Sequence, residues 1–333
     1  MKFGLNLRDF LSDPERSIYS QLEDTAAIIR DATSLGFWGA YMPQHWISHP
    51  TIWLQPIPVL ARLAPENSNL KLITGIVLLP LHNPIQVADE VATMDHITNG
   101  RFILGVGLGY RDVEFEVAGT SRKERVSRFR ESIKLMKLLW SGEEVTFEGK
   151  HWKLRGGRLG LTPVQQPHPP IWIACQSPVT ARRSATLGDG CLLGPRIEWR
   201  YFQELADTYW QTVHEAPSPT EGFLASHRCI SIAPTRQEAL QAAQEKVETS
   251  ARMYGTWRMQ EPTISNLGLS STKDLSEWAI VGTPEECAET IALCEEEMKV
   301  DYMGLTFLNL PRDPSQRREY LQYVSEELLS RFA

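Results

Sequence analysis

Hydrophobic positions along this chain fall into short runs that alternate with longer stretches of helical spacing. Runs rich in apolar and β-branched residues predict strands at 3–7, 38–42, 70–79, 101–106, 171–175, 191–193, 229–233 and 302–308. Apolar residues with a helical repeat predict helices at 21–35, 54–64, 85–98, 124–140, 179–187, 198–214, 235–252, 284–298 and 315–331. The predicted elements therefore alternate from one end of the chain to the other.

This alternation predicts a parallel sheet, because each parallel crossover needs a connection long enough to hold a helix. Eight strands are the number that closes a (β/α)8 TIM barrel, and an open doubly wound sheet is the alternative. We expect one barrel domain of this α/β class over residues 1–333.

Two segments are longer than an ordinary connection and predict insertions after strands 4 and 7 of the barrel. Residues 142–170 contain a hairpin pattern, with strands at 145–148 and 151–154, followed by a proline-rich stretch. Residues 253–282 have little periodicity and include Trp257. Long insertions in compact folds are often lids over a functional site, so we expect both segments to be lid-like.

Composition narrows the classes of protein to consider. The chain carries 34 Lys and Arg against 41 Asp and Glu, and this net charge of −7 argues against a nucleic-acid partner. No window approaches the roughly 20 apolar residues of a membrane span, and the first apolar run is too short for a signal peptide. Five cysteines without a CxxC pair favour a reducing compartment. We expect a cytoplasmic protein that does not bind membranes.

Candidate chemistry lies where the predicted strands end, since barrel active sites are built at the carboxyl ends of strands. His45 directly follows the second strand, a position suited to proton transfer. His49 lies four residues further on, a spacing that two zinc ligands could also have. A hydrolytic metal barrel would add histidines on strand 1, where residues 4–7 offer none, so we predict no metal site.

Two further motifs bear on cofactor binding. Residues 105–109 read Gly-Val-Gly-Leu-Gly, but the third glycine comes one residue too early for a dinucleotide fingerprint. Small residues there would instead let a flat ring or a neighbouring backbone approach closely. Ser177 and Pro178 have the pattern of a helix N-cap, with Thr180 in the first turn. Free backbone N–H groups of this turn could cradle a phosphate, or the cap could serve stability alone.

Four segments, taken together, resemble the bacterial luciferase-like monooxygenases. They are residues 99–107, the pair Gly36-Phe37 with His45 eight residues on, residues 170–174 and residues 187–190. They follow the family's order, and the likeness covers essentially the whole chain. The resemblance implies a (β/α)8 barrel that binds reduced FMN (FMNH2), or in one branch a deazaflavin, and that usually forms a homodimer.

Carried over position by position, the resemblance implies a role for each matched residue. His45 would lie beside the reactive edge of the flavin. The residues implied in cofactor binding are Thr74, Gly75, Gly107, Tyr110, Gln176, Ser177 and Thr180. Within that set, residues 176–180 match the phosphate-binding turn, and residues 74–75 fall where the third strand passes the flavin ring.

Some positions depart from the family's pattern. Many members have Glu where this chain has Gln44, and the luciferase catalytic chain has a second histidine where this chain has Trp46. Luciferases place an arginine for the cofactor phosphate at the position of Leu108. Arg111, Arg182 or the backbone alone would then have to take that role.

From these features we expect the oxygenase component of a two-component FMN-dependent monooxygenase. It would use O2 and the FMNH2 that a separate flavin reductase supplies. The substrate is expected to be a small, hydrophobic organic molecule. The residues expected to contact it are Trp46, His49, Arg111 and Trp257.

Two alternatives stay open. A deazaflavin-dependent hydride transferase could use the same barrel, although the sugar-phosphate dehydrogenases of that branch carry an acid at the position of Leu108 and a tryptophan at that of His49. A non-catalytic protein that only binds flavin would keep FMN without consuming O2.

Overall fold

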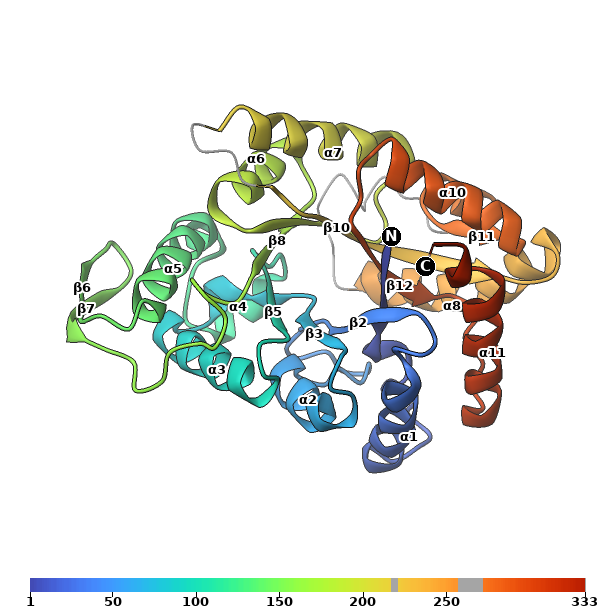
Figure 1. Ribbon diagram of the computed structural model, residues 1–333, viewed down its shortest axis with the longest axis horizontal. Coiled ribbons are helices and arrows are strands. Elements are labelled where there is room, and N and C mark those ends of the chain that lie inside the picture. The colour runs from blue at the N-terminus through green and yellow to red at the C-terminus, as the bar shows by residue number, and fades with distance from the viewer. Residues whose placement is uncertain (217–220, 257–271, 333) are drawn as a thin grey trace.

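Eight parallel strands form a closed barrel, which confirms the predicted TIM barrel (Figure 1). The computed structural model describes residues 1–216, 221–256 and 272–332. The barrel strands are β1 (Lys2–Asn6), β2 (Phe37–Met42), β3 (Lys71–Thr74), β5 (Phe102–Gly107), β8 (Ile171–Cys175), β9 (Gly190–Leu193), β10 (Leu224–Ile232) and β12 (Tyr302–Phe307). β10 pairs with both β9 and β12, and β12 pairs with β1, so the sheet closes. Two short strands extend it, β4 (Val77–Leu78) beside β5 and β11 (Ile280–Gly282) beside β10.

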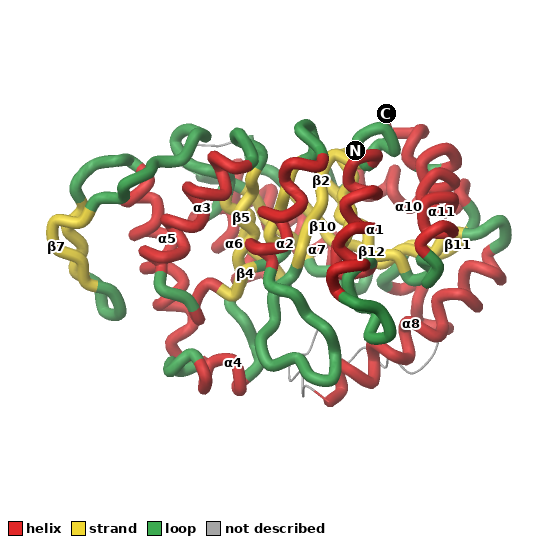
Figure 2. The backbone as a smooth tube through the Cα atoms, turned by 90° about the horizontal axis from the view of Figure 1, so that it is seen from below, coloured by secondary structure: helices red, strands yellow, loops and turns green. Residues whose placement is uncertain are grey.

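The predicted helices are confirmed, and they lie outside the strands (Figure 2). They are α1 (Ile18–Asp31), α2 (Pro56–Leu63), α3 (Pro84–Ile97), α5 (Arg125–Trp140), α6 (Pro178–Leu187), α7 (Trp199–His214), α8 (Arg236–Thr256), α10 (Pro284–Glu296) and α11 (Pro314–Glu327). The short helix α4 (Asp112–Val117) is not predicted by the sequence pattern, because it is brief and its N-cap makes no side-chain hydrogen bond. Within the described ranges, no helix has the length and apolar character needed to cross a membrane.

Several helices begin where the sequence supplies a capping side chain. The side chain of Thr283 accepts a hydrogen bond from the backbone N–H of Glu286, whose own side chain caps Thr283 in return. Ser177 caps α6 in the same reciprocal way with Thr180. Each cap stabilises a helix by about 1 kcal/mol. Because α6 follows barrel strand β8 and α10 follows the short strand β11, the caps also fix where each strand-to-helix loop turns.

Aromatic side chains fill the amino-terminal end of the barrel. Trp172 stacks on Trp38 with ring centroids 6.3 Å apart and on Phe223 with centroids 5.0 Å apart. The ring of Tyr302 packs against Trp172 at 5.2 Å and is fully buried. These residues lie at or just before the beginnings of their strands, so the space left inside the barrel lies toward the carboxyl ends.

The hairpin predicted within residues 142–170 is present, but it does not cover the barrel mouth. Strands β6 (Val145–Glu148) and β7 (Lys153–Gly157) pair antiparallel and project beyond α5 (Figure 1). On α5, the Glu131 carboxylate accepts hydrogen bonds from the backbone N–H groups of Lys150 and His151. These contacts lie on the outside of the barrel, so they do not support the lid role expected of this segment.

The second insertion, 253–282, is described only in part. Residues 257–271, which include Trp257, lie outside the described residues. The described portion contains the end of α8, the short helix η5 (Thr272–Glu277) and β11. Trp278, between η5 and β11, is buried in a small apolar cluster with Leu275 and Cys229. This part of the insertion therefore belongs to the packed wall of the barrel.

Strands β3 and β5 touch at a point where a side chain does not fit. The Thr74 hydroxyl donates a hydrogen bond to the carbonyl oxygen of Gly105 at 2.8 Å. A Cβ added to Gly105 would lie 1.9 Å from the carbonyl oxygen of Thr74. After Thr74 the chain bulges through a cis peptide bond between Gly75 and Ile76 before β4 begins. The close contact at Gly105 therefore fixes the strand end that leads into the bulge.

Replacing Gly105 with alanine is expected to destabilise the fold by about 2–3 kcal/mol, because the backbone carbonyl of Thr74 cannot swing aside. Urea unfolding followed by circular dichroism measures the loss as a lower midpoint. Gly160→Ala is the matched control, since a Cβ at that position meets no atom within 4 Å. Equal midpoints for the two variants would contradict the close-packing argument.

Candidate functional site

A cavity of about 360 Å³ lies at the carboxyl ends of the barrel strands. That volume falls in the range of small-molecule sites, roughly 300–1,000 Å³. Six of the predicted site residues are among those that line it, namely His45, Gly75, Tyr110, Gln176, Ser177 and Thr180. The cavity therefore brings together residues that follow four different strands of the barrel.

His45 is buried, and its imidazole ring is held by a carboxylate. Its Nδ1 lies 2.9 Å from Oε1 of Glu114, and its Nε2 lies 3.3 Å from the hydroxyl of Tyr110. Because a carboxylate oxygen accepts, Nδ1 carries the proton of the neutral ring and Nε2 is the acceptor. The indole of Trp53 packs edge-on against the imidazole at 4.7 Å. The ring is thus fixed in one orientation and one tautomer.

The surroundings of His45 favour its neutral form. Burial lowers the pKa of His45 from its ordinary value and is the largest effect, while the hydrogen bond and the charge of Glu114 raise that pKa. The positive charges of Arg111 and Arg8 lower it further. A neutral imidazole whose Nε2 accepts can take a proton or a hydrogen bond from a group in the cavity.

Glu114, on α4, accepts hydrogen bonds from the segment after β2. Its side chain is fully buried, and Oε1 accepts hydrogen bonds from Nδ1 of His45, from the backbone N–H of Trp46 at 3.0 Å and from Nη1 of Arg111 at 3.2 Å. A buried carboxylate is costly unless it is paired and hydrogen-bonded. This one is paired and hydrogen-bonded through Oε1, while Oε2 is buried and has no hydrogen bond among the described residues. No spacing rule in the sequence indicates this role, because α4 itself is not predicted.

Arg111 supports the loop after β2 instead of facing a substrate. Its Nη1 donates to the carbonyl oxygen of Trp46 at 2.6 Å, and its Nη2 donates to that of Ile47 at 3.1 Å. Arg111 is buried and is not among the residues that line the cavity. The expected contact of Arg111 with substrate is therefore corrected to a positioning role, in which the guanidinium holds the loop that carries His45.

Gln44 explains one departure from the family's pattern. Its Oε1 accepts from the backbone N–H of Leu78 at 2.9 Å and from Nε2 of His82 at 3.0 Å, while its Nε2 donates to Oε1 of Gln55 at 3.0 Å. Gln55 in turn donates to the carbonyl oxygen of His45 at 3.1 Å. An amide can accept and donate at once, which an ionised glutamate cannot. Burial lowers the pKa of His82 to about 4, so this network is uncharged at neutral pH.

The turn before α6 presents hydroxyl groups to the cavity. The backbone N–H groups of Gln176 and Ser177 donate to Oγ1 of Thr180 at 3.0 and 2.9 Å. These two N–H groups are therefore engaged within the turn, whereas the sequence pattern suggested that they are free. Ser177 and Thr180 both line the cavity, and their hydroxyls lie 3.1 Å apart at the positive end of the helix.

Arg125, at the start of α5, places a positive charge near α6. It lines the cavity, and its Nη1 donates to the carbonyl oxygen of Gly109 at 3.1 Å. Burial lowers the pKa of the nearby Arg183, and the charges of Arg130 and Arg125 lower it further. Positive charge is thus concentrated near the start of α6. Arg182, which the sequence analysis offered for this role, is exposed on the outside of the helix.

Of the other six residues predicted for the site, five are in the described part of the chain and do not line the cavity. Thr74 is fully buried behind it, and a Cβ on Gly107 would lie 2.0 Å from Cδ1 of Ile76. Trp46 packs edge-on against His82 at 5.2 Å, away from the cavity. His49 is exposed, Arg111 is accounted for above, and Trp257 lies outside the described residues.

Several residues that line the cavity were missed by the sequence analysis. Arg125 belongs to a basic run that reads as an exposed helix face, and only its place at the first turn of α5 could have marked it. Tyr41 and Thr306 share a hydrogen bond of 2.9 Å between their hydroxyls, and Lys246 pairs with Asp9 at 3.0 Å. In the described ranges, no cluster of three His, Cys, Asp or Glu side chains could hold a metal.

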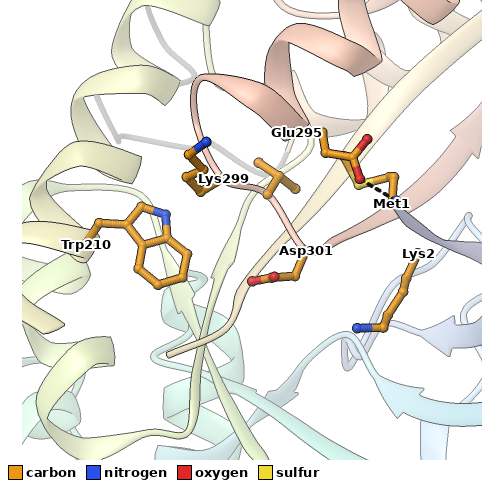
Figure 3. Close-up of a pocket in the computed structure, with 7 residues that line it drawn as sticks. Met1, Lys2, Trp210, Glu295, Lys299 and Asp301 are labelled. Carbon is orange, nitrogen blue, oxygen red and sulfur yellow. Dashed lines mark hydrogen bonds and ion pairs between the residues drawn. The ribbon is translucent and has the colours of Figure 1, made fainter. Parts of the chain in front are cut away.

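A second cavity, of about 340 Å³, lies at the opposite end of the barrel around the first residue of the chain (Figure 3). The Met1 ammonium pairs with Glu295, and the Asp301 carboxylate accepts from the backbone N–H of Leu224 at 2.8 Å. Trp210 forms one wall and donates its indole N–H to the carbonyl oxygen of Met298. These groups are engaged with the protein itself, so we assign no ligand to this cavity.

Changing Glu114 to glutamine is expected to lower the pKa of His45 further, because the carboxylate raises it. The variant should also lose about 3 kcal/mol of stability, since Arg111 loses a buried counter-charge. NMR titration of the imidazole and urea unfolding measure the two effects. Glu116→Gln, on the exposed face of the same helix, is the control. An unchanged His45 pKa in the Glu114 variant would argue against the carboxylate's role.

Comparison with known proteins agrees with this fold. Monooxygenase RslO1 from Streptomyces bottropensis is similar over 100% of both chains, with a TM-score of 0.84 and 26% identity. The oxygenase component of a flavin-dependent trigonelline monooxygenase from Acinetobacter baylyi is 31% identical over 54% of this chain and 50% of its own. An F420-dependent glucose-6-phosphate dehydrogenase from Gordonia bronchialis is 27% identical over 75% of this chain and 74% of its own.

The match to a family model decides which family this is. The model for the luciferase-like monooxygenases matches residues 1–301. This range includes every described strand of the barrel except β12, and it includes the described cavity residues that come before β12 in the chain. Relatives in this group are flavin-dependent or F420-dependent oxidoreductases. The chain belongs to the luciferase-like monooxygenase family.

Proposed function

We propose that this protein is the oxygenase component of a two-component, FMNH2-dependent monooxygenase acting on a small, hydrophobic organic substrate. The observation that carries the proposal is the neutral imidazole of His45, whose Nε2 lies at a largely apolar cavity while Glu114 holds its other nitrogen. A separate flavin reductase would supply the FMNH2, and O2 would be the co-substrate. The likeness to RslO1 over the whole chain supports a monooxygenase.

The residues around the cavity fit FMN. The hydroxyls of Ser177 and Thr180 and the guanidinium of Arg125 form a cationic, hydrogen-bonding end that suits a phosphate. The cavity is also lined by Gly75 at the bulge, whose backbone a flat ring would approach from the cavity side. These residues would hold the phosphate and the ring, and His45 would lie at the reacting edge.

FMNH2 would supply two electrons, so that one atom of O2 enters the substrate and the other leaves as water. His45 has the protonation state to assist this exchange, because its neutral Nε2 can take a proton from a cavity group and return it. The hydroxyl of Tyr110 lies 3.3 Å from Nε2 of His45 and orients the lone pair of that nitrogen. Glu114 stabilises the imidazolium whenever the ring is protonated.

Apolar walls would keep water from the reacting groups. The aliphatic side chains that line the cavity are Ile76, Leu78, Leu108, Leu192, Leu193, Ile197 and Leu308. Excluding water strengthens hydrogen bonds inside the site and limits unproductive reaction of O2 with reduced flavin. The same walls favour a hydrophobic substrate over a strongly hydrated one.

A deazaflavin-dependent hydride transferase is the second candidate function. It is favoured by the similarity to an F420-dependent dehydrogenase over three quarters of both chains. The same cavity would serve, and His45 would again handle a proton at the reacting edge. This chain has neither the acid at Leu108 nor the tryptophan at His49 that sugar-phosphate dehydrogenases of that branch carry, so such a substrate is not proposed.

Anaerobic equilibrium dialysis against FMN, FMNH2 and F420 tests the choice of cofactor. We expect FMNH2 to be retained and, once O2 is admitted, the absorbance of bound flavin to return to that of oxidised FMN. In His45→Ala the rate of that return should fall by about 100-fold, the usual effect of a lost proton-transfer group. His214→Ala, an exposed histidine on α7, is the control.

Two results would contradict the monooxygenase, and a third would contradict the role of His45. Retention of F420 without FMN or FMNH2 would leave the hydride transferase. Tight retention of FMN with no substrate-dependent O2 uptake would leave a flavin-binding protein without catalysis. Equal rates of flavin reoxidation in wild type and His45→Ala would remove His45 from the chemistry.

Arg125→Gln is expected to weaken FMN binding about tenfold while leaving riboflavin binding unchanged, because only FMN carries the phosphate. Fluorescence titration with the two flavins measures the ratio of their dissociation constants. Arg182→Gln is the matched control, since this arginine is exposed on α6. Equal weakening of FMN and riboflavin in the Arg125 variant would mean that this residue supports the ring or the fold instead of the phosphate.

A further inference from the structure

His227, in the middle of β10, is the one histidine of the cavity wall that the proposed chemistry leaves without a role among the described residues. Its side chain points into the barrel, lines the cavity and is only 6% exposed. The imidazole stacks on the ring of Tyr41, with centroids 3.7 Å apart and planes 16° from parallel. It is therefore held flat at a fixed place deep in the cavity.

Neither ring nitrogen of His227 has a hydrogen bond in the described part of the protein, and Nε2 is fully buried. A neutral imidazole has one N–H to donate and one nitrogen to accept, and leaving such groups unmet in the interior is costly. Burial lowers the pKa of His227 to about 3, so the ring is neutral at neutral pH and the cost of its unmet groups remains. By contrast, the buried imidazoles of His45 and His82 both have hydrogen-bond partners.

Neighbouring polar groups do not meet the need of His227. The hydroxyl of Tyr41 lies 2.9 Å from Oγ1 of Thr306, which also accepts from Nδ2 of Asn6 at 3.0 Å. These three side chains satisfy one another along β2, β12 and β1. Nε2 is enclosed by the protein, so the ring nitrogen that can find a partner in whatever occupies the cavity is Nδ1.

The rings of His227 and Tyr41 fill the space beside Gly75 and Gly304. A Cβ added to Gly75 would lie 2.7 Å from Cε1 of His227, and one added to Gly304 would lie 2.6 Å from its Cδ2. His227 thus sits directly against Gly75, the bulge residue past which the flavin ring is proposed to lie. A ring at that bulge would bring its polar edge to the imidazole.

We propose that His227 binds the flavin by a hydrogen bond between its imidazole and the pyrimidine edge of the ring. That edge presents carbonyl oxygens on either side of an N–H, and one of these oxygens would accept a hydrogen bond from Nδ1–H of His227. This inference rests on the proposed function only in requiring a flavin or deazaflavin, because both cofactors carry this edge. His227 is then a cofactor-binding residue that remains neutral across the working pH range.

The test uses FMN labelled with ¹³C at its two pyrimidine carbonyl carbons, bound to wild type, His227→Phe and His227→Gln. A hydrogen bond deshields a carbonyl carbon, so in His227→Phe we expect at least one of these signals to move upfield. The dissociation constant for FMN should rise about tenfold. His227→Gln keeps an N–H donor and should recover part of both effects. If FMN is not retained but F420 is, the same comparison is made with F420.

Thermal melting of the protein without cofactor separates binding from a structural role. His227→Phe keeps the stack on Tyr41 and removes an unmet polar group, so its melting temperature should equal or exceed that of wild type. A buried histidine that served the fold would give the opposite result. His168→Phe, which removes an imidazole near α5 and away from the cavity, is the control for both measurements.

The outcomes distinguish this inference from the proposed function. Wild-type protein that binds FMN, with unchanged affinity and unchanged carbonyl signals in His227→Phe, overturns the role of His227 alone. A large drop in melting temperature in His227→Phe that His227→Gln repairs, with flavin binding unaffected, makes His227 a structural residue and also overturns it. Binding of neither FMN nor F420 by wild type overturns the proposed function together with this inference.

Discussion

The buried carboxylate of Glu114 is the constraint on which the rest of the site depends. It accepts hydrogen bonds from the imidazole of His45, from a backbone N–H of the loop after β2 and from the guanidinium of Arg111. Two of these donors, Trp46 and Arg111, come from loops that are 65 residues apart in the chain. One desolvated charge thus joins the loop that carries the proton-transfer group to helix α4, and it cannot be removed without leaving a buried cation short of a counter-charge.

Much of the fold could be predicted from the sequence because its signals are local. A strand buried on both faces reads as an apolar run, and helix starts are marked by caps such as Ser177 and Thr283. The candidate site was predicted best where a residue directly follows a strand, as His45 does. Pairing between distant segments, such as His45 with Glu114, leaves no periodicity, so only the folded chain reveals it.

The errors have the same origin. Segment length alone predicts that 142–170 is an insertion, but not on which side of the barrel it packs, and its hairpin lies on the outer face of α5. Arg111 and Arg125 look equivalent in the sequence, since each follows strand β5 among other charged residues. Arg111 turns toward two carbonyl oxygens and a carboxylate, whereas Arg125 turns toward the cavity, and this difference is decided by tertiary contacts.

The aromatic plug made by Trp38, Trp172, Phe223 and Tyr302 closes the amino-terminal end of the barrel. In the part of the chain that the structure describes, the cavity is therefore a pocket with a single entrance side at the carboxyl ends of the strands. When two ligands share the pocket, the one that reaches His227 has to bind before the one that stops near His45. The ligand at His227 also has to dissociate last. Binding in such a pocket is ordered by depth, so a molecule held near the mouth slows exchange of whatever lies beneath it.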